Sequence, residues 1–174
     1  MLSATDLKKM EKYNHLMKYE KEVMKVLLSS PVLAELCKNR EVDEDEIPTL
    51  KWTNYFPSLF IEDTITETEA YILYNFDMTE NYRADTYFDG KLIFQIFCHK
   101  DVLRVPNGVS TRYSAIVSEL CRLFDDKNIL GIALNSKYSD IIISPKNPKY
   151  VARELVFDIK DIAERSMENY HEEN

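Results

Sequence analysis

The sequence is poor in glycine, cysteine and tryptophan, with three, three and one of these residues among its 174. The three glycines form neither a GxGxxG nor a GxxxxGK[ST] pattern, which argues against a loop that cradles nucleotide phosphates. The cysteines, Cys37, Cys98 and Cys121, are odd in number and scattered. They do not describe a disulfide framework, and they favour a reducing compartment.

Long apolar runs and a basic surplus are also absent. No apolar run approaches the ~18 residues needed to span a bilayer, and residues 1–9 lack the apolar core of a secretory signal. We therefore expect a soluble protein made in the cytoplasm, with no membrane partner. The net charge of −8 disfavours stable binding to nucleic acid, although DNA can pass an acidic surface without sticking to it.

The chain has the composition of a globular domain, with 45% hydrophobic and 30% charged residues. We predict a single domain over residues 1–174. Its parts are N-terminal helices at 5–38, an acidic linker at 39–50, an α+β core at 51–160 and a polar tail at 161–174. The acidic run at 40–46 is either a solvated linker or a patch for a basic partner.

Apolar residues at helical spacing predict a long helix over residues 5–29 and a second, short helix over 32–38 that Pro31 can begin. The clearest helix spans 110–126, with Ser110 or Thr111 placed to cap it. Its apolar stripe consists of Tyr113, Ile116, Val117, Leu120, Cys121 and Phe124. We expect this helix to cross one face of a sheet.

Strand patterns occupy the rest of the core. Residues 52–61 are rich in aromatic residues, but Pro57 restricts them to an edge strand or an extended arm. Strands are predicted at 70–76, 91–98, 129–134, 140–144 and 150–159. The segment 77–90 is too long for a tight turn, so it is either a protruding loop or an extension of both strands into a long β-arm. The fold class is α+β, with a mixed or mostly antiparallel sheet, one crossing helix and an N-terminal helix pair.

Few residues have the pattern of a reactive site. Cys98 and His99 are neighbours on a predicted strand, so their side chains point to opposite faces and do not readily ligate one ion. Cys121 lies on the apolar stripe of its helix. We therefore predict no catalytic residue, no metal and no cofactor.

One enzyme alternative uses carboxylates. Asp77 ends one predicted strand and Asp89-Gly90-Lys91 begins the next, which loosely matches metal-dependent nucleases. The simpler interpretation makes Asp89-Gly90 a turn and Lys91 a solvent-facing residue. Because the acidic chain lacks the basic surface that a nuclease needs, we expect no enzyme.

Aromatic residues in two segments are candidates for an interface. In the segment 77–90 they are Tyr82, Arg83, Tyr87 and Phe88, residue types that are enriched at interaction hot spots. In the segment around Pro57 they are Tyr55, Phe56 and Phe60. The first segment either projects or folds back on its own sheet. The second either caps the core or adds to the sheet of a neighbour.

Four stretches in the middle of the chain together form a distinctive pattern. They are Phe56-Pro57-Ser58-Leu59-Phe60-Ile61, Thr66-Glu67-Thr68-Glu69-Ala70-Tyr71-Ile72, Cys98-His99-Lys100-Asp101-Val102-Leu103-Arg104 and Thr111-Arg112-Tyr113 with the helix that follows. This pattern resembles small neck proteins of tailed bacteriophages. The order of elements resembles the tail-terminator, or tail-completion, fold over roughly residues 50–160.

The resemblance implies a ring, usually hexameric, that ends the tail tube and joins it to the head connector. The implied partners are further copies of the chain, the tail tube protein and the head connector or adaptor, with DNA only in passage. The implied location is the neck of the virion, assembled in the bacterial cytoplasm. A closed ring of this kind needs two different complementary patches on each copy.

Two alternatives differ from a tail terminator without being enzymes. The N-terminal helix pair is less typical of the tail-terminator family. A head-completion or adaptor protein of the neck is therefore nearly as well supported by the resemblance. A monomeric module that binds a host protein through the acidic linker is the third class.

Overall fold

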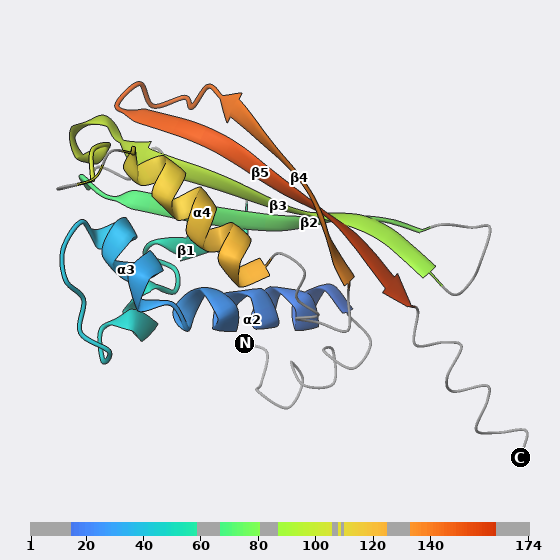
Figure 1. Ribbon diagram of the computed structural model, residues 1–174. Coiled ribbons are helices and arrows are strands. Elements are labelled where there is room, and N and C mark those ends of the chain that lie inside the picture. Colours follow the sequence, from blue (N-terminus) through green and yellow to red (C-terminus); the bar gives the residue numbers. More distant parts are fainter. Residues whose placement is uncertain are drawn as a thin grey trace, which may run out of the picture.

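The computed structural model describes residues 15–58, 67–80, 87–105, 108, 110–124 and 133–162 (Figure 1). In chain order its elements are α2 (His15–Leu28), α3 (Pro31–Lys38), the 3-10 turn η1 (Ile47–Leu50), β1 (Tyr55–Phe56), β2 (Ala70–Glu80), β3 (Tyr87–His99), the 3-10 turn η2 (Lys100–Val102), α4 (Arg112–Phe124), β4 (Ala133–Ile143) and β5 (Tyr150–Ile162). Residues 1–14, where the first predicted helix begins, lie outside this description.

The five strands form one open sheet in the order β1-β2-β3-β5-β4. The short strand β1 runs parallel to β2, and the other neighbours are antiparallel. The described helices α2, α3 and α4 cover one face of the sheet, and α4 crosses it (Figure 1). The structure thus confirms the α+β class, the mixed sheet, the N-terminal helix pair and the crossing helix.

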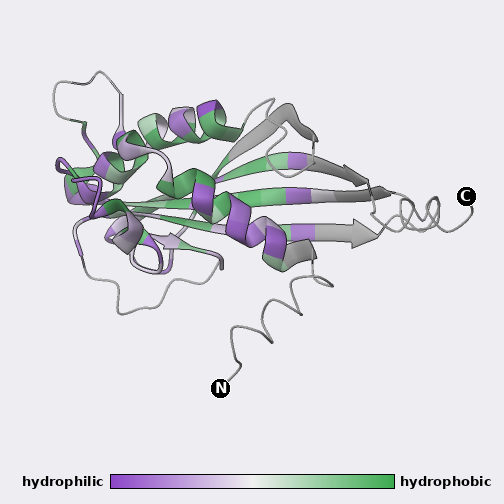
Figure 2. Ribbon diagram, turned by 90° about the horizontal axis from the view of Figure 1, so that it is seen from below, coloured by the Kyte–Doolittle hydropathy of each residue, from purple (hydrophilic) through white to green (hydrophobic). Residues whose placement is uncertain are grey.

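The core lies between the sheet and the helices. Alternate residues of β2 and β3 point toward the helices, and Phe94 is fully buried at the centre of β3. Its ring centroid lies 5.0 Å from that of Phe124 on α4 and 6.1 Å from that of Phe157 on β5. The helices alternate hydrophilic and hydrophobic residues (Figure 2), so each buries one stripe of its surface.

The helices α3 and α4 each begin with a side-chain cap. The Thr111 hydroxyl accepts a hydrogen bond from the Ser114 N–H at 3.2 Å, so Thr111 caps α4. The buried Ser30 hydroxyl accepts from the Leu33 N–H at the start of α3, which Pro31 begins as predicted. The same hydroxyl donates to the Glu119 carboxylate of α4 and so joins the two helices.

A buried arginine joins the ends of three elements. Arg112, the first residue of α4, is only 3% exposed. Its guanidinium donates to the Val102 carbonyl of η2 at 2.7 Å, to the Leu36 carbonyl of α3 at 2.9 Å and to the Asn39 side-chain oxygen. These acceptors are neutral, and burial lowers the pKa of Arg112. The arginine thus acts as a branched hydrogen-bond donor that fixes α3 and η2 to α4.

The structure decides between the two interpretations of residues 77–90. β2 continues to Glu80 and β3 begins at Tyr87, and the pairing continues from Asp77↔Lys91 out to Glu80↔Phe88. β5 accompanies β3 to the pair Tyr87↔Ile162. The structure therefore confirms that both strands extend into a long β-arm. The arm consists of the outer ends of β2, β3 and β5. Asp89-Gly90 lies within β3, so the predicted turn at these residues is wrong.

The division of residues 129–144 into two strands is also wrong. β4 is one strand from Ala133 to Ile143, paired with β5, with an irregularity between Leu134 and Tyr138. The polar residues 135–139 had the pattern of a loop. Residues 135–137 lie at this irregularity, where the pairing with β5 is interrupted, and an interruption of this kind bends a strand without ending it. Residues 129–132 lie outside the description.

Candidate interaction surfaces

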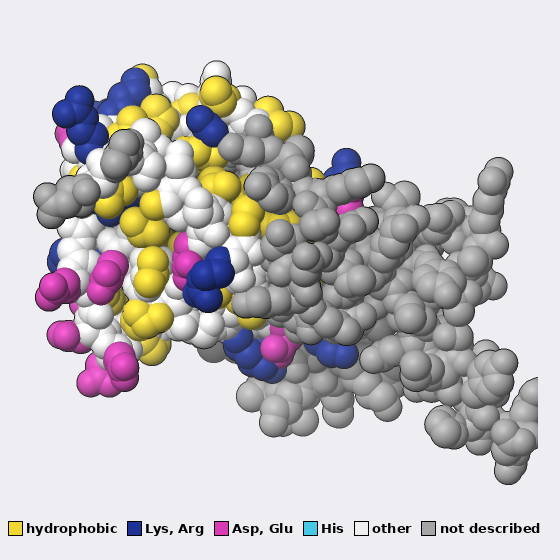
Figure 3. Space-filling view, viewed as in Figure 1, with side chains coloured by type: hydrophobic (Ala, Val, Ile, Leu, Met, Phe, Trp, Pro, Cys, Tyr) yellow, Lys and Arg dark blue, Asp and Glu magenta, His cyan; other side chains and the backbone are white. Residues whose placement is uncertain are grey.

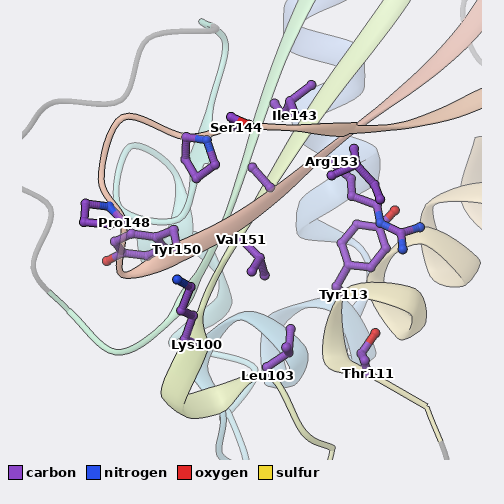
Figure 4. Close-up of a pocket in the computed structure, with 13 residues that line it drawn as sticks. Lys100, Leu103, Thr111, Tyr113, Ile143, Ser144, Pro148, Tyr150, Val151 and Arg153 are labelled. Carbon is purple, nitrogen blue, oxygen red and sulfur yellow. The ribbon is translucent and has the colours of Figure 1, made fainter.

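A pocket of about 460 Å³ opens where the start of β5 meets η2 and the beginning of α4 (Figure 4). Leu103, Ile142 and Val151 give it apolar walls, and Ile142 on the edge strand β4 is 76% exposed. The guanidinium of Arg153 lies over the Tyr113 ring, 4.2 Å from its centroid. The size and lining are those of a site that receives an apolar or aromatic group.

Lys100 and Arg153 line this pocket, and further basic residues neighbour its lining residues in the sequence. The backbone N–H of Lys100 donates to the Lys149 carbonyl at 2.9 Å, which holds η2 against the β4–β5 connection. The segments 100–104 and 144–153 contain five basic residues and one acid, Asp101, a net charge of +4 in a chain of net charge −8. Figure 3 shows dark-blue basic side chains gathered at the upper left, over these segments. We call this feature the basic-rimmed pocket.

Acidic residues gather on a different part of the surface. The segment 40–46, the acidic segment, contains five acids against Arg40 and has a net charge of −4. Arg40 donates two hydrogen bonds to Glu46 and lowers the pKa of that carboxyl. The remaining four acids, Glu41, Asp43, Glu44 and Asp45, are exposed. Figure 3 shows magenta acidic side chains gathered at the lower left, over this segment and away from the dark-blue group.

An exposed tryptophan follows the acidic segment. η1 anchors the chain through buried Ile47 and Leu50, and Trp52 then turns outward with 58% of its surface exposed. Its φ of 66° lies in the left-handed region, where a bulky residue costs about 1–2 kcal/mol. Its N–H donates to the Tyr55 carbonyl at 2.9 Å, which holds this conformation. The Phe56 ring lies edge-on, with centroids 6.5 Å apart, and the two rings form what we call the Trp52 knob.

The predicted interface residues around Pro57 differ in how far they are exposed. Tyr55 is fully buried and packs in the core. Its hydroxyl faces the Cys37 thiol, a weak partner, and is the one buried side-chain polar atom without a conventional hydrogen bond in the described residues. Phe56 remains half-buried and accessible. It also packs against Tyr71, Leu73, Phe97, Tyr150 and Ala152, a small cluster on the face opposite the helices. Phe60 lies outside the described residues.

The candidates on the β-arm are located only in part. Tyr82 and Arg83 lie outside the described residues. Tyr87 and Phe88 belong to β3, where Phe88 pairs with Glu80 and Asp161 and Tyr87 pairs with Ile162. Only their backbone is described. Both residues lie at the far end of the arm. Because only their backbone is described, an interface role for the arm stays a prediction.

The carboxylates of the nuclease alternative lie on the arm too. Asp77 pairs with Lys91, and Lys91 pairs on its other side with Asp158 of β5. The lysine therefore stands between two aspartates in one row across the sheet, an ordinary cross-strand charge arrangement. Asp89 pairs with Thr79, and its side chain is not described. Among the described residues no group of three or more His, Cys, Asp or Glu could hold a metal ion.

The cysteines and His99 occupy packed positions. Cys98 lies in the core beside the helices, whereas His99 accepts a hydrogen bond from the Asp101 N–H and packs against Tyr150 on the other side. Burial raises the pKa of the Cys98 thiol to about 12. It also raises the pKa of the fully buried Cys37 thiol. Cys37, Cys98 and His99 are therefore packing residues in the folded protein, and the two thiols are shielded from reaction.

We expect no more than one thiol per chain, that of the half-buried Cys121, to react with Ellman's reagent in the native protein. A raised pKa keeps Cys37 and Cys98 protonated at mildly basic pH, and burial blocks access. All three thiols should react in guanidinium, which serves as the control. Rapid reaction of two or more thiols without denaturant would contradict this arrangement.

Sequence reasoning missed both the basic-rimmed pocket and the Trp52 knob. The pocket combines the segments 100–103, 111–113 and 142–153, which only the sheet order brings together. The sequence did contain a sign of the knob, because Trp52 is the single tryptophan and follows the acidic run and η1 with only Lys51 between. Its outward orientation depends on a left-handed backbone that the sequence does not indicate.

A comparison with models of protein families places most of the chain in a known family. The model of the YomW family matches residues 12–159, most of the chain. The chain belongs to the YomW family. The family name derives from a Bacillus phage, so this YomW-family chain is a phage-associated protein. Its helices, as far as the structure describes them, are too short or too polar to cross a membrane. No curated protein matches the chain.

Proposed function

We propose that this YomW-family protein is a structural component of the phage neck. Copies of it form a ring that ends the tail tube and joins it to the head connector. The β-arm is the single observation that carries the proposal. β2, β3 and β5 run on past the ends of α2 and α4 (Figure 1), so three paired strands project from the layered body. A projecting arm can reach a neighbouring copy or line a ring.

The charge of the arm supports the same role. Residues 77–80, 87–91 and 158–162 contain five acids and two lysines, a net charge of −3. An arm of this charge repels a phosphate backbone, which suits a lumen through which DNA passes without binding. A nucleic-acid-binding arm would need the opposite sign.

The proposal is tested by the state of the purified protein with and without tail tubes. We expect light scattering and negative-stain electron microscopy to show closed rings, and we expect the rings to stop elongation of the tail tube protein of the same phage. Binding to the connector alone would favour an adaptor in its place. A monomer at every concentration, with and without tubes, would overturn the proposal. So would Mg²⁺-dependent cleavage of DNA that Asp89→Ala abolishes.

Shortening the β-arm should separate folding from assembly. Replacement of residues 80–88 by Asn-Gly keeps the pair Thr79↔Asp89 and closes it with a two-residue hairpin turn. We expect this variant to keep the wild-type circular dichroism spectrum but to lose tube termination, because the helices and the core stay intact. The matched control inserts Asn-Gly after Asp63, between β1 and β2, outside the arm and outside the segments that line the pocket. Normal termination by the shortened variant would contradict a role for the arm.

A further inference from the structure

We propose that the Trp52 knob of one copy docks into the basic-rimmed pocket of the next copy, so that the chain associates head to tail. This inference rests on the proposed function, because it takes the ring from there. It adds the two patches that meet between neighbouring copies. A ring built from one heterologous contact needs two different patches on each copy. The knob and the pocket are such a pair.

The two patches lie at opposite edges of the sheet. One row of paired residues crosses it from Tyr55 on β1 through Ile72, Ile96 and Arg153 to Ile142 on β4. Four strand spacings separate the ends of this row, about 19 Å. Trp52 precedes β1 at one end, and Ile142 lines the pocket at the other. A single copy therefore cannot fill its own pocket with its own knob across the width of the sheet, but a neighbour can.

The chemistry of the two patches matches. An indole is a large, rigid, apolar group, and tryptophan is enriched among the anchors of protein interfaces. The pocket offers about 460 Å³ between apolar walls. Lys100 and Arg153 at its sides can lie against the face of an aromatic ring. The exposed side chain of Ile142 would be covered by the same contact.

The charges around the patches are complementary as well. The acidic segment precedes the knob and carries −4, whereas the two segments around the pocket carry +4. Figure 3 shows the two groups at the lower and upper left of the same view, so they are separated on one copy. Contact between knob and pocket would bring the acidic segment of one copy toward the basic rim of the next. Like-charged patches would instead face each other if two knobs or two pockets met.

The backbone at Trp52 gives a third, independent argument. A strained residue persists where the surrounding structure fixes it, and such residues cluster at functional contacts. Here two backbone hydrogen bonds, from the Trp52 N–H to the Tyr55 carbonyl and from the Asn54 N–H to the Leu50 carbonyl, hold Trp52 in the left-handed conformation. In this conformation its indole faces outward. Folding alone would be served better by glycine at this position.

Trp52 allows the contact to be observed directly, because it is the only tryptophan in the chain. We expect its emission to shift to the blue as the wild-type concentration rises, in step with the mass from light scattering. Trp52→Ala removes the knob and Ile142→Glu blocks the pocket, and both positions are exposed, so neither change should disturb folding. Each variant alone should stay monomeric, and the emission of Ile142→Glu should stay red-shifted at all concentrations.

An equimolar mixture of the two variants gives the decisive result. Ile142→Glu still has its knob and Trp52→Ala still has its pocket, so the mixture should form one-to-one dimers with blue-shifted emission, and high salt should weaken them. Val32→Ala, on an exposed apolar residue outside both patches, should behave as wild type. No dimer in the mixture, or wild-type rings from either single variant, would overturn the inference and leave the proposed ring standing. A wild-type protein that stays monomeric with tail tubes would overturn both.

Discussion

Arg112→Ala is expected to lower the free energy of unfolding by about 3–5 kcal/mol. The substitution leaves the Val102 and Leu36 carbonyls and the Asn39 side-chain oxygen without their donor in a junction where Arg112 itself is 3% exposed. Each buried acceptor that loses its hydrogen bond costs about 1–3 kcal/mol, and the missing side chain adds a cavity. Urea unfolding followed by circular dichroism measures the loss.

Two further variants separate geometry from charge at this junction. Arg112→Lys keeps the positive charge but loses the planar fork that reaches several acceptors at once, so it should be destabilising too, though less than alanine. Arg40→Ala is the matched control, since Arg40 is exposed and pairs with Glu46, whose side chain is itself partly exposed. It should change stability little. If Arg112→Ala cost no more than Arg40→Ala, the junction would not depend on the buried guanidinium.

The helices could be predicted because their side chains follow the helical period, as the stripe of α4 does with its one buried face. The central strands could be predicted because β2 and β3 are dense in aromatic and branched apolar residues, and in β2 both faces are buried between Ala70 and Tyr74. The β-arm could not be decided in the same way. The sequences of residues 77–80 and 87–90 do not alternate apolar and polar residues, so only the backbone pairing, which sequence patterns do not reveal, identifies them as strands. The polar middle of β4 was missed for another reason: it lies at an irregularity in the pairing with β5, between Leu134 and Tyr138, through which the strand continues without an apolar pattern.

The candidate surfaces were less predictable than the fold. Aromatic residues near Pro57 were expected to be accessible, but β1 pairs with β2 and turns Tyr55 inward, while the accessible rings are Phe56 and Trp52. The acidic segment was visible in the sequence as a possible patch. Its basic counterpart was not, because Lys100, Lys149 and Arg153 become neighbours only through the sheet order and the contact between η2 and the β4–β5 connection.

Phe94→Ala should be the most destabilising substitution in the hydrophobic core, at about 3–5 kcal/mol. The Phe94 side chain is fully buried and its ring meets those of Tyr74, Phe124 and Phe157, which come from β2, α4 and β5. Removing it opens a cavity where the crossing helix meets three neighbouring strands, and these elements cannot all close inward at once. The loss should appear as a lower denaturation midpoint with an unchanged dependence on urea.

Ile93→Ala provides the matched control for this effect. Ile93 is the next residue on β3 but points to the opposite face, where it is half-buried beside Val156. Its truncation should cost about 1 kcal/mol. The contrast between adjacent positions follows from the side on which the helices pack, since a strand places successive side chains on opposite faces. Equal losses at the two positions would mean that both faces of the sheet are covered to the same degree, as when the open face is buried against another copy. In that case the Ile93→Ala loss should shrink on dilution, whereas the Phe94→Ala loss should not.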